Sequence, residues 1–456
     1  MRLLKPLLLS ILVVVPAIAR ADGIDGMALC LVPSITINVD TVADTAADDG
    51  VTSLREGIAR ARANPQCDAG WDTINLALPI GAVITLSDGL DLGDDRVRIV
   101  GNGAVTLRSS KTSEPLFDIG RTSQETDVIF SRLTLDGASV ARTQPAIRAG
   151  AGTKLTLDRV VIQDFDAGTS APGAIDADGV AGLQIVDSAL LENRGSHASR
   201  PGGGAVNLAA AATGGVFSIV RSTFLLNETV AGSSGGALLS QLPVGVGLLI
   251  DSSTFAGNVA GMNGGGLAHS GGPLTVVNST FSANEAGAAG GGIRVAGDGL
   301  SIRHATIVVN TAGSGGGLAV PVGVPVVGTH NIVSLNTASV EDDNLQLDAS
   351  LSSLAYSLVD MSAFMLNLGE LGLYGGSLPV HMPLPGSAAI NTGEASVITA
   401  PARDQRGVAR VQGADIDIGA VEVVVATGDD DGGGVLSWSA LAGLGLLLLR
   451  RRTARR

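Results

Sequence analysis

The sequence is poor in cysteine, in aromatic residues and in charged residues. It has 2 Cys among 456 residues, and aromatic and charged side chains make up 3% and 16% of the chain. So few cysteines exclude a disulfide-dense scaffold, and so few aromatics argue against a platform that stacks sugar rings or bases. Because 43 acidic residues face 29 basic residues, nucleic acid is not an expected partner.

What the chain has instead is glycine, at 63 residues, and one repeated phrase. The phrase leads from an apolar pair through a triplet such as Ser-Thr-Phe to an asparagine, and a Gly pair follows, as in LIDSSTFAGN with NGGGLA. The last three intervals between its asparagines are 26 residues each. Such a period, filled with β-forming residues and glycine, predicts stacked coils of a solenoid. The asparagines are Asn193, Asn227, Asn258, Asn284, Asn310 and Asn336.

Aligning the copies on these asparagines gives chemically uniform columns. We expect the two apolar columns to stack in the interior, and the asparagines to form a ladder in which buried amides satisfy one another. The Gly pairs mark another corner, and the abundance of Gly, Thr, Val and Ile opposes a helical solenoid. The apolar columns are Leu190, Phe224, Phe255, Phe281, Ile307 and Val333, and Ile185, Ile219, Ile250, Val276 and Ile302.

This phrase of FxxN followed by GGA or GGG resembles the repeats of polymorphic outer membrane proteins and other right-handed parallel β-helix surface proteins. The resemblance covers about residues 185–340. It implies an all-β, right-handed parallel β-helix on a cell surface, often adhesive, and it implies no reaction.

Both ends of the chain carry export features. Met1 to Ala21 has basic residues, an apolar stretch and small residues at its end, as in a Sec-type signal peptide. The other end has an acidic Gly linker, fifteen mostly apolar residues from Val435 to Leu449, and RRRTARR. It resembles a GlyGly-CTERM sorting signal of Gram-negative bacteria, which implies cleavage by a rhomboid-type protease near Gly432, Gly433 and Gly434. The alternative is a retained membrane anchor.

The region after the signal peptide has its own features. Cys30 and Cys67 are expected to form a disulfide, the alternative being two buried thiols. Ser53 and Glu56 form a capping box that predicts a helix as far as Arg62, and this helix would cover the first coil. The stretch TSLREGIARAR with WDTINLAL resembles the CSLREA region of exported β-helix proteins, although Thr52 replaces the usual cysteine.

The region after the repeats resembles a choice-of-anchor Q region, which joins β-helix repeats to sorting tails, over about residues 368–423. The motifs LPGSAAINTG and DQRGVARVQGADIDIGAVE carry this resemblance. The sequence therefore divides into a signal peptide (1–21), an N-terminal cap (22–90), β-helix repeats (91–345), C-terminal coils or cap (346–425), an acidic Gly linker (426–434) and a sorting or anchor tail (435–456).

Catalytic and metal-binding patterns are mostly missing. His304 and His330 lie one period apart, which allows a shared metal, but without a third ligand we expect a solvated or turn-facing polar column. We assign no catalytic residue, no metal ligand and no cofactor, with Ca²⁺ at paired acids as an alternative. Those acids are Asp94 with Asp95, Asp176 with Asp178, and Asp415 with Asp417.

The leading hypothesis is an exported, non-catalytic adhesin or binding protein for a glycan, matrix or cell-surface ligand. We expect it at the cell surface, in the outer membrane or outside a Gram-negative bacterium, with its tail in transient or lasting contact with a membrane. One alternative is a polysaccharide lyase or glycoside hydrolase whose acids lie between Asp136 and Asp187. Another is a rigid surface spacer.

Overall fold

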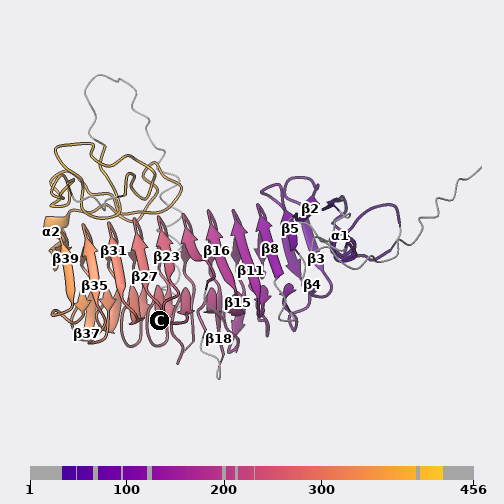
Figure 1. The fold of residues 1–456 in the computed structure, drawn as a ribbon, viewed down its shortest axis with the longest axis horizontal. Helices are drawn as coiled ribbons and strands as arrows, with labels where there is room; N and C mark the ends of the chain where they lie inside the picture. Colours follow the sequence, from indigo (N-terminus) through magenta and orange to yellow (C-terminus); the bar gives the residue numbers. More distant parts are fainter. Residues whose placement is uncertain are drawn as a thin grey trace, which may run out of the picture.

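The structure, a computed structural model, describes residues 33–47, 49–64, 70–93, 96–120, 126–197, 202–210, 214–230, 232–396 and 401–424. The chain winds into stacked coils whose parallel strands form three long sheets (Figure 1). The predicted all-β, right-handed parallel β-helix is therefore confirmed. Across these described ranges, every helix is too short or too polar to span a bilayer.

The first sheet runs the full length of the solenoid and pairs only parallel strands in the described residues. Its strands are β1 (Thr36–Val39), β2 (Asp72–Leu76), β5 (Arg96–Val100), β8 (Thr126–Ser131), β11 (Thr153–Asp158), β16 (Gly182–Val186), β20 (Phe217–Val220), β23 (Leu248–Asp251), β27 (Leu274–Val277), β31 (Leu300–Arg303), β35 (Val326–Thr329) and β39 (Ser352–Ala355).

The second sheet follows the first after one corner of each coil. Its strands are β3 (Val83–Leu86), β6 (Thr106–Ser109), β9 (Thr134–Asp136), β12 (Val161–Gln163), β17 (Ala189–Leu191), β21 (Thr223–Leu225), β24 (Thr254–Ala256), β28 (Thr280–Ser282), β32 (Thr306–Val308), β36 (Ile332–Ser334) and β40 (Leu358–Val359).

The third sheet closes each coil. Its strands are β4 (Leu90–Gly93), β7 (Phe117–Ile119), β10 (Ile147–Ala149), β15 (Ile175–Val180), β19 (Val206–Ala210), β22 (Leu238–Gln241), β26 (Leu267–Gly271), β30 (Ile293–Gly297), β34 (Leu318–Ala319) and β38 (Leu345–Gln346). Two short sheets lie between the second and the third. They contain β13 (Asp166–Gly168), β14 (Ser170–Ala171) and β18 (Arg194–His197), and β25 (Val259–Ala260), β29 (Glu285–Ala286), β33 (Thr311–Ser314) and β37 (Thr337–Glu341).

Left-handed residues make the corner between the first and second sheets. One such residue stands six positions before each ladder asparagine, with φ between 45° and 57°. Asn, Asp and His tolerate this conformation better than most residues, which explains why the column is largely polar. Its members are Asp187, Arg221, Ser252, Asn278, His304 and His330. The Gly pairs make another corner: a Cβ on Gly264 would lie 2.2 Å from the carbonyl oxygen of Leu267.

The predicted apolar columns fill the interior. Phe224, Phe255 and Phe281 occupy equivalent positions in β21, β24 and β28, and their ring centroids are 4.6 and 4.8 Å apart in nearly parallel planes. The isoleucine column lies on neighbouring strands of the first sheet, with Ile219 beside Ile250. Burying each such side chain contributes about 1.5–3 kcal/mol relative to leaving it exposed.

The six asparagines also form one buried column. Asn258 Nδ2 donates to Asn284 Oδ1 at 2.9 Å, and Asn284 Nδ2 donates to Asn310 Oδ1 at 2.9 Å. Each amide also reaches a backbone group of an adjacent coil; for example, Asn284 Nδ2 donates to the carbonyl of Phe255 at 2.9 Å. The ladder therefore satisfies the polar groups of a buried corner.

Helix α1 (Leu54–Arg62) covers the first coil. Ser53 and Glu56 form the predicted capping box, with Ser53 Oγ accepting from the Glu56 amide at 3.2 Å and Glu56 Oε2 accepting from the Ser53 amide at 2.8 Å. Leu54, Ile58 and Ala61 are buried on its inner face. The predicted cap region also supplies β1 to β4, so the solenoid begins well before residue 91.

Residues 361–396 and 401–424, here called the C-terminal segment, fold back along the side of the solenoid. The last coil ends with β40, and the segment then passes through α2 (Ala363–Leu366) and lies along the outer face of the second sheet (Figure 1). Thr254 Oγ1 donates to the carbonyl of Pro379 at 2.8 Å, and Thr280 Oγ1 donates to Gln405 Oε1 at 2.6 Å. The predicted C-terminal coils or cap thus comprise one last coil and a lateral cover.

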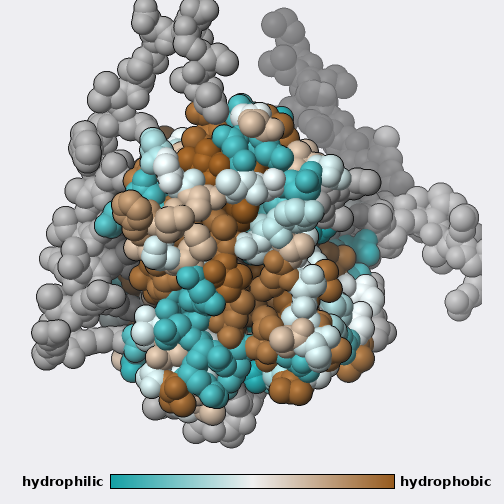
Figure 2. Space-filling view, turned by 90° about the vertical axis from the view of Figure 1, so that its left-hand side faces the viewer, coloured by the Kyte–Doolittle hydropathy of each residue, from teal (hydrophilic) through white to brown (hydrophobic). Residues whose placement is uncertain are grey.

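The far end of the solenoid carries an apolar surface. Figure 2 views this end, and hydrophobic residues gather in the middle of the face. Leu351, Tyr356 and Phe364 are exposed here, and Leu354 is only partly buried. The described residues therefore leave the edge strands β38, β39 and β40 without a helix comparable to α1.

Candidate functional site

A column of polar side chains crosses the outer face of the third sheet near its N-terminal end. Asp91, Asp118, Arg148, Asp176 and Asn207 are register partners on β4, β7, β10, β15 and β19. Successive strands of a sheet are about 4.8 Å apart, so one polar group follows another along the solenoid axis. Further along, the same column is interrupted by apolar residues: it continues with Leu239 and Ala268, and then with Arg294, Ala319 and Gln346.

Direct contacts hold this column together. Arg148 Nη1 lies 3.5 Å from Asp118 Oδ2, and Arg148 also donates to Gln144 Oε1. Asn207 Nδ2 donates to Asp176 Oδ1 at 3.0 Å. Asp118, Asp176 and Asn207 are buried, whereas the Arg148 side chain is 41% exposed. The guanidinium of Arg148 is therefore the charged group of the column that solvent or a ligand reaches most easily.

A hollow of about 350 Å³ lies over this part of the sheet. It is lined by Gly89, Leu90, Asp91, Ser113, Glu114, Pro115, Asp118, Gln144 and Arg148. We call this hollow, together with the column beneath it, the polar groove. Its lining combines carboxylates, an amide and a guanidinium, which can accept and donate hydrogen bonds to hydroxyl groups.

Charged groups at the rim are held in their ionised forms. Lys111 Nζ lies 2.6 Å from Asp88 Oδ1 and 2.7 Å from Glu114 Oε1. The hydrogen bond from Lys111, followed by that from the amide of Gly89, lowers the pKa of Glu114 below its usual range. The hydrogen bonds to Asp88 and Glu114 raise the pKa of Lys111. The rim is therefore charged at neutral pH, with acids in excess.

The other acids of the predicted catalytic region do not join this column. Asp164 is a left-handed corner residue that accepts from Ser139 Oγ at 3.1 Å, and Asp166 pairs with Arg194 at 3.2 Å on the short sheet of β13 and β18. Asp178 lies on β15 two residues beyond Asp176 and is exposed. Only Asp176 and Asp178 therefore belong to the face that forms the groove.

The sequence prediction missed Asp118 and Arg148. The signal was a second recurring phrase, in which an apolar pair precedes a polar residue and a further apolar residue. It occurs as Leu116-Phe-Asp-Ile-Gly120, Ala146-Ile-Arg-Ala-Gly150 and Ala174-Ile-Asp-Ala177. Aligning these copies would have placed Asp118, Arg148 and Asp176 in one column.

His304 and His330 correct another prediction. They were expected in a solvated or turn-facing column. Both stand at the left-handed corner, as in a turn-facing column, but their side chains are completely buried, because the C-terminal segment covers this corner. Their rings stack with centroids 4.8 Å apart. Within the described ranges, no group of three or more His, Cys, Asp or Glu side chains could hold a metal ion.

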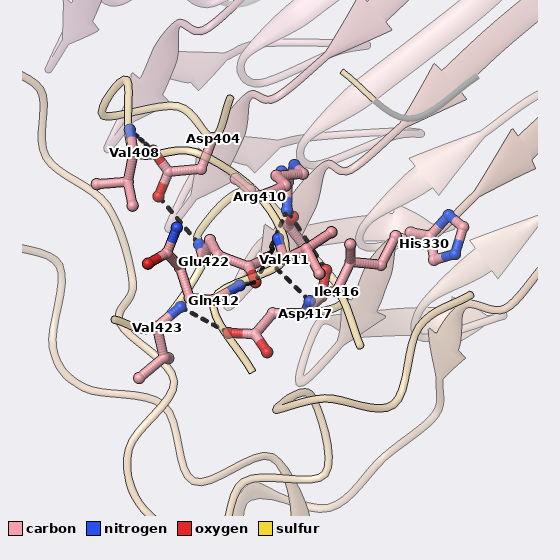
Figure 3. A network of polar contacts seen from close by, with 12 residues as sticks. His330, Asp404, Val408, Arg410, Val411, Gln412, Ile416, Asp417, Glu422 and Val423 are labelled. Atoms are coloured by element: carbon pink, nitrogen blue, oxygen red, sulfur yellow. Dashed lines mark hydrogen bonds and ion pairs between the residues drawn. The ribbon is translucent and has the colours of Figure 1, made fainter. Parts of the chain in front are cut away.

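A second polar cluster lies inside the C-terminal segment (Figure 3). Arg406 Nη2 is 2.8 Å from Asp404 Oδ2, and Arg410 Nη1 is 3.6 Å from Glu422 Oε2, with all four side chains buried. Burial lowers the pKa of Arg410 to about 10 and raises the pKa of Glu422. Glu422 accepts from the amides of Val411, Gln412 and Asp417, so backbone groups already occupy its oxygens.

Backbone amides also occupy the carboxylate of Asp417. Its carboxylate accepts from the amides of Asn391 and Val423, at 2.7 and 2.6 Å, and burial raises its pKa. Asp415 accepts instead from the amides of Ala395 and Ile416. The predicted acidic pair therefore holds loops of the segment together, and we interpret this cluster as structural.

Several predicted residues lie outside the described part of the chain. These are Cys30, Cys67, Asp94, Asp95, Gly432, Gly433 and Gly434. The six ladder asparagines are buried, so they belong to the scaffold and not to a surface site.

Comparisons with known proteins add no activity. No protein-family model matches the sequence, and no curated protein matches it. Among solved structures, the chain is similar to pectate lyase Pel9A, with 12% identity, a TM-score of 0.46, and coverage of 86% of this chain and 97% of that one. It is also similar to the A-module of the mannuronan C-5 epimerase AlgE6 of Azotobacter vinelandii, with 15% identity, a TM-score of 0.31, and coverage of 72% and 100%. Neither likeness identifies a function for this chain.

Proposed function

We propose that the protein binds a glycan chain in the polar groove of the third sheet. The observation that carries this proposal is the column of Asp91, Asp118, Arg148, Asp176 and Asn207, which presents one polar group per strand along the solenoid axis. A linear polymer lying along this axis would contact the half-exposed side chains of Asp91 and Arg148, which the more buried groups of the column support from below. Individually weak hydrogen bonds to many hydroxyl groups of the polymer would together give specific binding.

The charge of the groove favours a neutral or amine-bearing glycan. Asp91, Glu114 and Asp118 line the hollow, and Arg148 is its one basic lining residue in the described chain. A polyanionic glycan would be repelled unless a divalent cation bridged it to the carboxylates.

The test is retention of purified full-length protein on immobilised polysaccharides. The panel contains a neutral glucan, a deacetylated amino-sugar polymer and a polyuronate, each with and without Ca²⁺. Arg148→Gln should weaken binding at least about tenfold, which corresponds to about 1.4 kcal/mol. Arg221→Gln is the matched control, because Arg221 is also a half-exposed arginine paired with an aspartate, Asp187, but on another corner. Equal binding by both variants would contradict the proposal.

Cleavage of the bound glycan is the second candidate. Arg148 lies between Asp118 and Asp176 on three adjacent strands, so two carboxylates and a cation can face one bond of a bound polymer. The same incubation is therefore assayed for new reducing or unsaturated ends. Products that appear with the wild type but not with Asp118→Asn would favour an enzyme, and retention without products would favour an adhesin.

We further propose export through the N-terminal signal and removal of the tail near Gly432 to Gly434. The proposal rests on the sequence of the two ends. Mass spectrometry of protein recovered from its native cells tests it. A mature product that still contains Trp438 and the terminal arginines would contradict cleavage and favour a membrane anchor.

A further inference from the structure

Histidines gather where the C-terminal segment meets the solenoid. The chain has five histidines, and three of them, His304, His330 and His381, lie in this contact. His304 and His330 come from the corner column of the solenoid, and His381 comes from the segment. Residues that change charge near pH 6.5 are thus concentrated at one interface.

His304 and His330 are held there as neutral rings. The amide of Glu394 donates to His330 Nε2 at 3.0 Å, so this nitrogen cannot take up a proton without losing the bond. Neither ring nitrogen of His304 has a hydrogen-bond partner among the described residues. The carbonyl of Gly419, beside that ring, already accepts from Arg410 Nη2 at 3.0 Å.

His381 makes a bridge in the opposite direction. Its Nδ1 lies 2.8 Å from the carbonyl of Gly369, which can only accept, so Nδ1 carries the proton. Its Nε2 lies 2.8 Å from Ser282 Oγ on β28 and accepts from that hydroxyl. If Nε2 took up a proton, Nε2 and the Ser282 hydroxyl would both be donors. The hydrogen bond between them would then be lost unless the hydroxyl rotated so that its oxygen accepted.

Charged groups from both the segment and the solenoid surround these rings. Arg410 of the segment and Arg303 of the solenoid face His304, and Arg410 also faces His330, so both cations oppose protonation. Asp415 and Glu394 lie near His330 and favour protonation. One further ring and one further acid lie beside these histidines. Tyr356 stacks on His330 with ring centroids 5.3 Å apart, and Glu370 lies near His381.

We propose that the C-terminal segment is a pH-gated cover, which stays closed over the second sheet while these three histidines are neutral and opens in mildly acidic solution. Opening would expose the hydroxyls of Thr254, Thr280 and Thr306, which the segment now contacts. This inference is independent of the glycan groove, because that groove lies on the third sheet.

Proton linkage gives the direction and the size of the effect of pH on the opening of the C-terminal segment. Burial is the main cause that lowers the pKa of all three histidines in the closed state, that of His304 to about 2. An exposed histidine has a pKa of about 6.5, so the open state binds more protons below that pH. Above it, the histidines favour neither state. Between pH 7.5 and pH 5.5, the opening constant should rise about tenfold through His304 alone. His330 and His381, whose pKa values burial also lowers, should add to this rise.

Hydrogen exchange of the full-length protein, followed by mass spectrometry and corrected for the intrinsic effect of pH, tests the proposal. On going from pH 7.5 to pH 5.5, peptides of residues 361–396 and 401–424 should lose protection by at least about tenfold, as one histidine alone would give. Peptides of β7, β10 and β15, which the segment does not touch, should keep theirs. Equal changes in both regions, or no change in the segment, would overturn the proposal.

A triple variant, His304→Asn with His330→Asn and His381→Gln, makes the test specific. Asn suits the left-handed corner and already occupies the same column as Asn278. The variant should lose the excess pH dependence of the segment, whereas His197→Gln, a histidine of β18 outside this interface, should keep it. If the triple variant is already open at pH 7.5, the three single variants are measured. His304→Asn should reduce the pH effect about tenfold, and the other two should each reduce it. Unchanged pH dependence in all of them would refute the gate.

Discussion

The coils from β20 to β36 and the coils from β4 to β19 share the same three sheets, yet they present different outer faces. In the later coils the repeat is regular, and the C-terminal segment covers the second sheet. In the earlier coils the repeat is irregular, and the third sheet carries the charged column of the polar groove. Interior positions and corner ladders must stack in every coil, but outward positions need not. A site can therefore arise where the outward residues depart from the repeat.

The largest effect should come from the interior of the regular coils. Phe255→Ala removes a fully buried ring stacked between Phe224 and Phe281, and should lower the free energy of unfolding by about 3–5 kcal/mol. Asp118→Asn in the groove should cost less than about 1 kcal/mol, because its partner Arg148 is largely exposed. Urea denaturation measures both. A larger loss for Asp118→Asn would mean that the column is structural.

The next largest effect should come from the buried ion pair of the C-terminal segment. Asp404→Asn leaves Arg406 buried without its ion partner, which should cost about 3 kcal/mol. Hydrogen exchange should show this loss in the C-terminal segment while the strands of the third sheet stay protected. Arg159→Gln, an exposed arginine paired with Asp158, is the control and should change neither region. Collapse of the whole solenoid would show that the later coils depend on their cover.

A smaller effect is expected at the asparagine ladder. Asn284→Ala removes the acceptor for Asn258 Nδ2 and for the Asn258 amide, and unpaired buried groups should cost about 2 kcal/mol. Asn207→Ala in the irregular coils removes one side-chain bond, to Asp176, and should cost less than half as much. Thermal and urea unfolding of the two variants compares the regular coils with the irregular coils directly. Equal losses would mean that the column of the groove is as much a scaffold as the ladder is.

The fold was predictable because its determinants repeat. Phe255 and Phe281, or Asn258 and Asn284, are identical residues 26 positions apart, and stacking is the physical reason for that identity. Asp118 and Arg148 have no such identity, so only strand register brings them together.

The place of the C-terminal segment could not be predicted either. Its contacts join residues far apart in sequence, such as Gln405 and Thr254, through hydrogen bonds that no pattern marks. For that reason the sequence allowed His304 a turn-facing or solvated position, but it did not predict the complete burial of its side chain.

The smallest effect should separate the two ends of the solenoid. Ser53→Ala removes the cap of α1, whose buried face covers the first coil, and should cost about 1 kcal/mol. Ser362→Ala removes the cap of α2, where the acceptor distance to the Met365 amide is 3.4 Å and the residue is exposed, so it should cost only a few tenths of a kcal/mol. Hydrogen exchange in β1 and β2 should rise in the first variant and stay unchanged in the second. Equal effects would mean that α2 stabilises its end of the solenoid as much as α1 does, and the apolar end would then be better protected than its exposed side chains indicate.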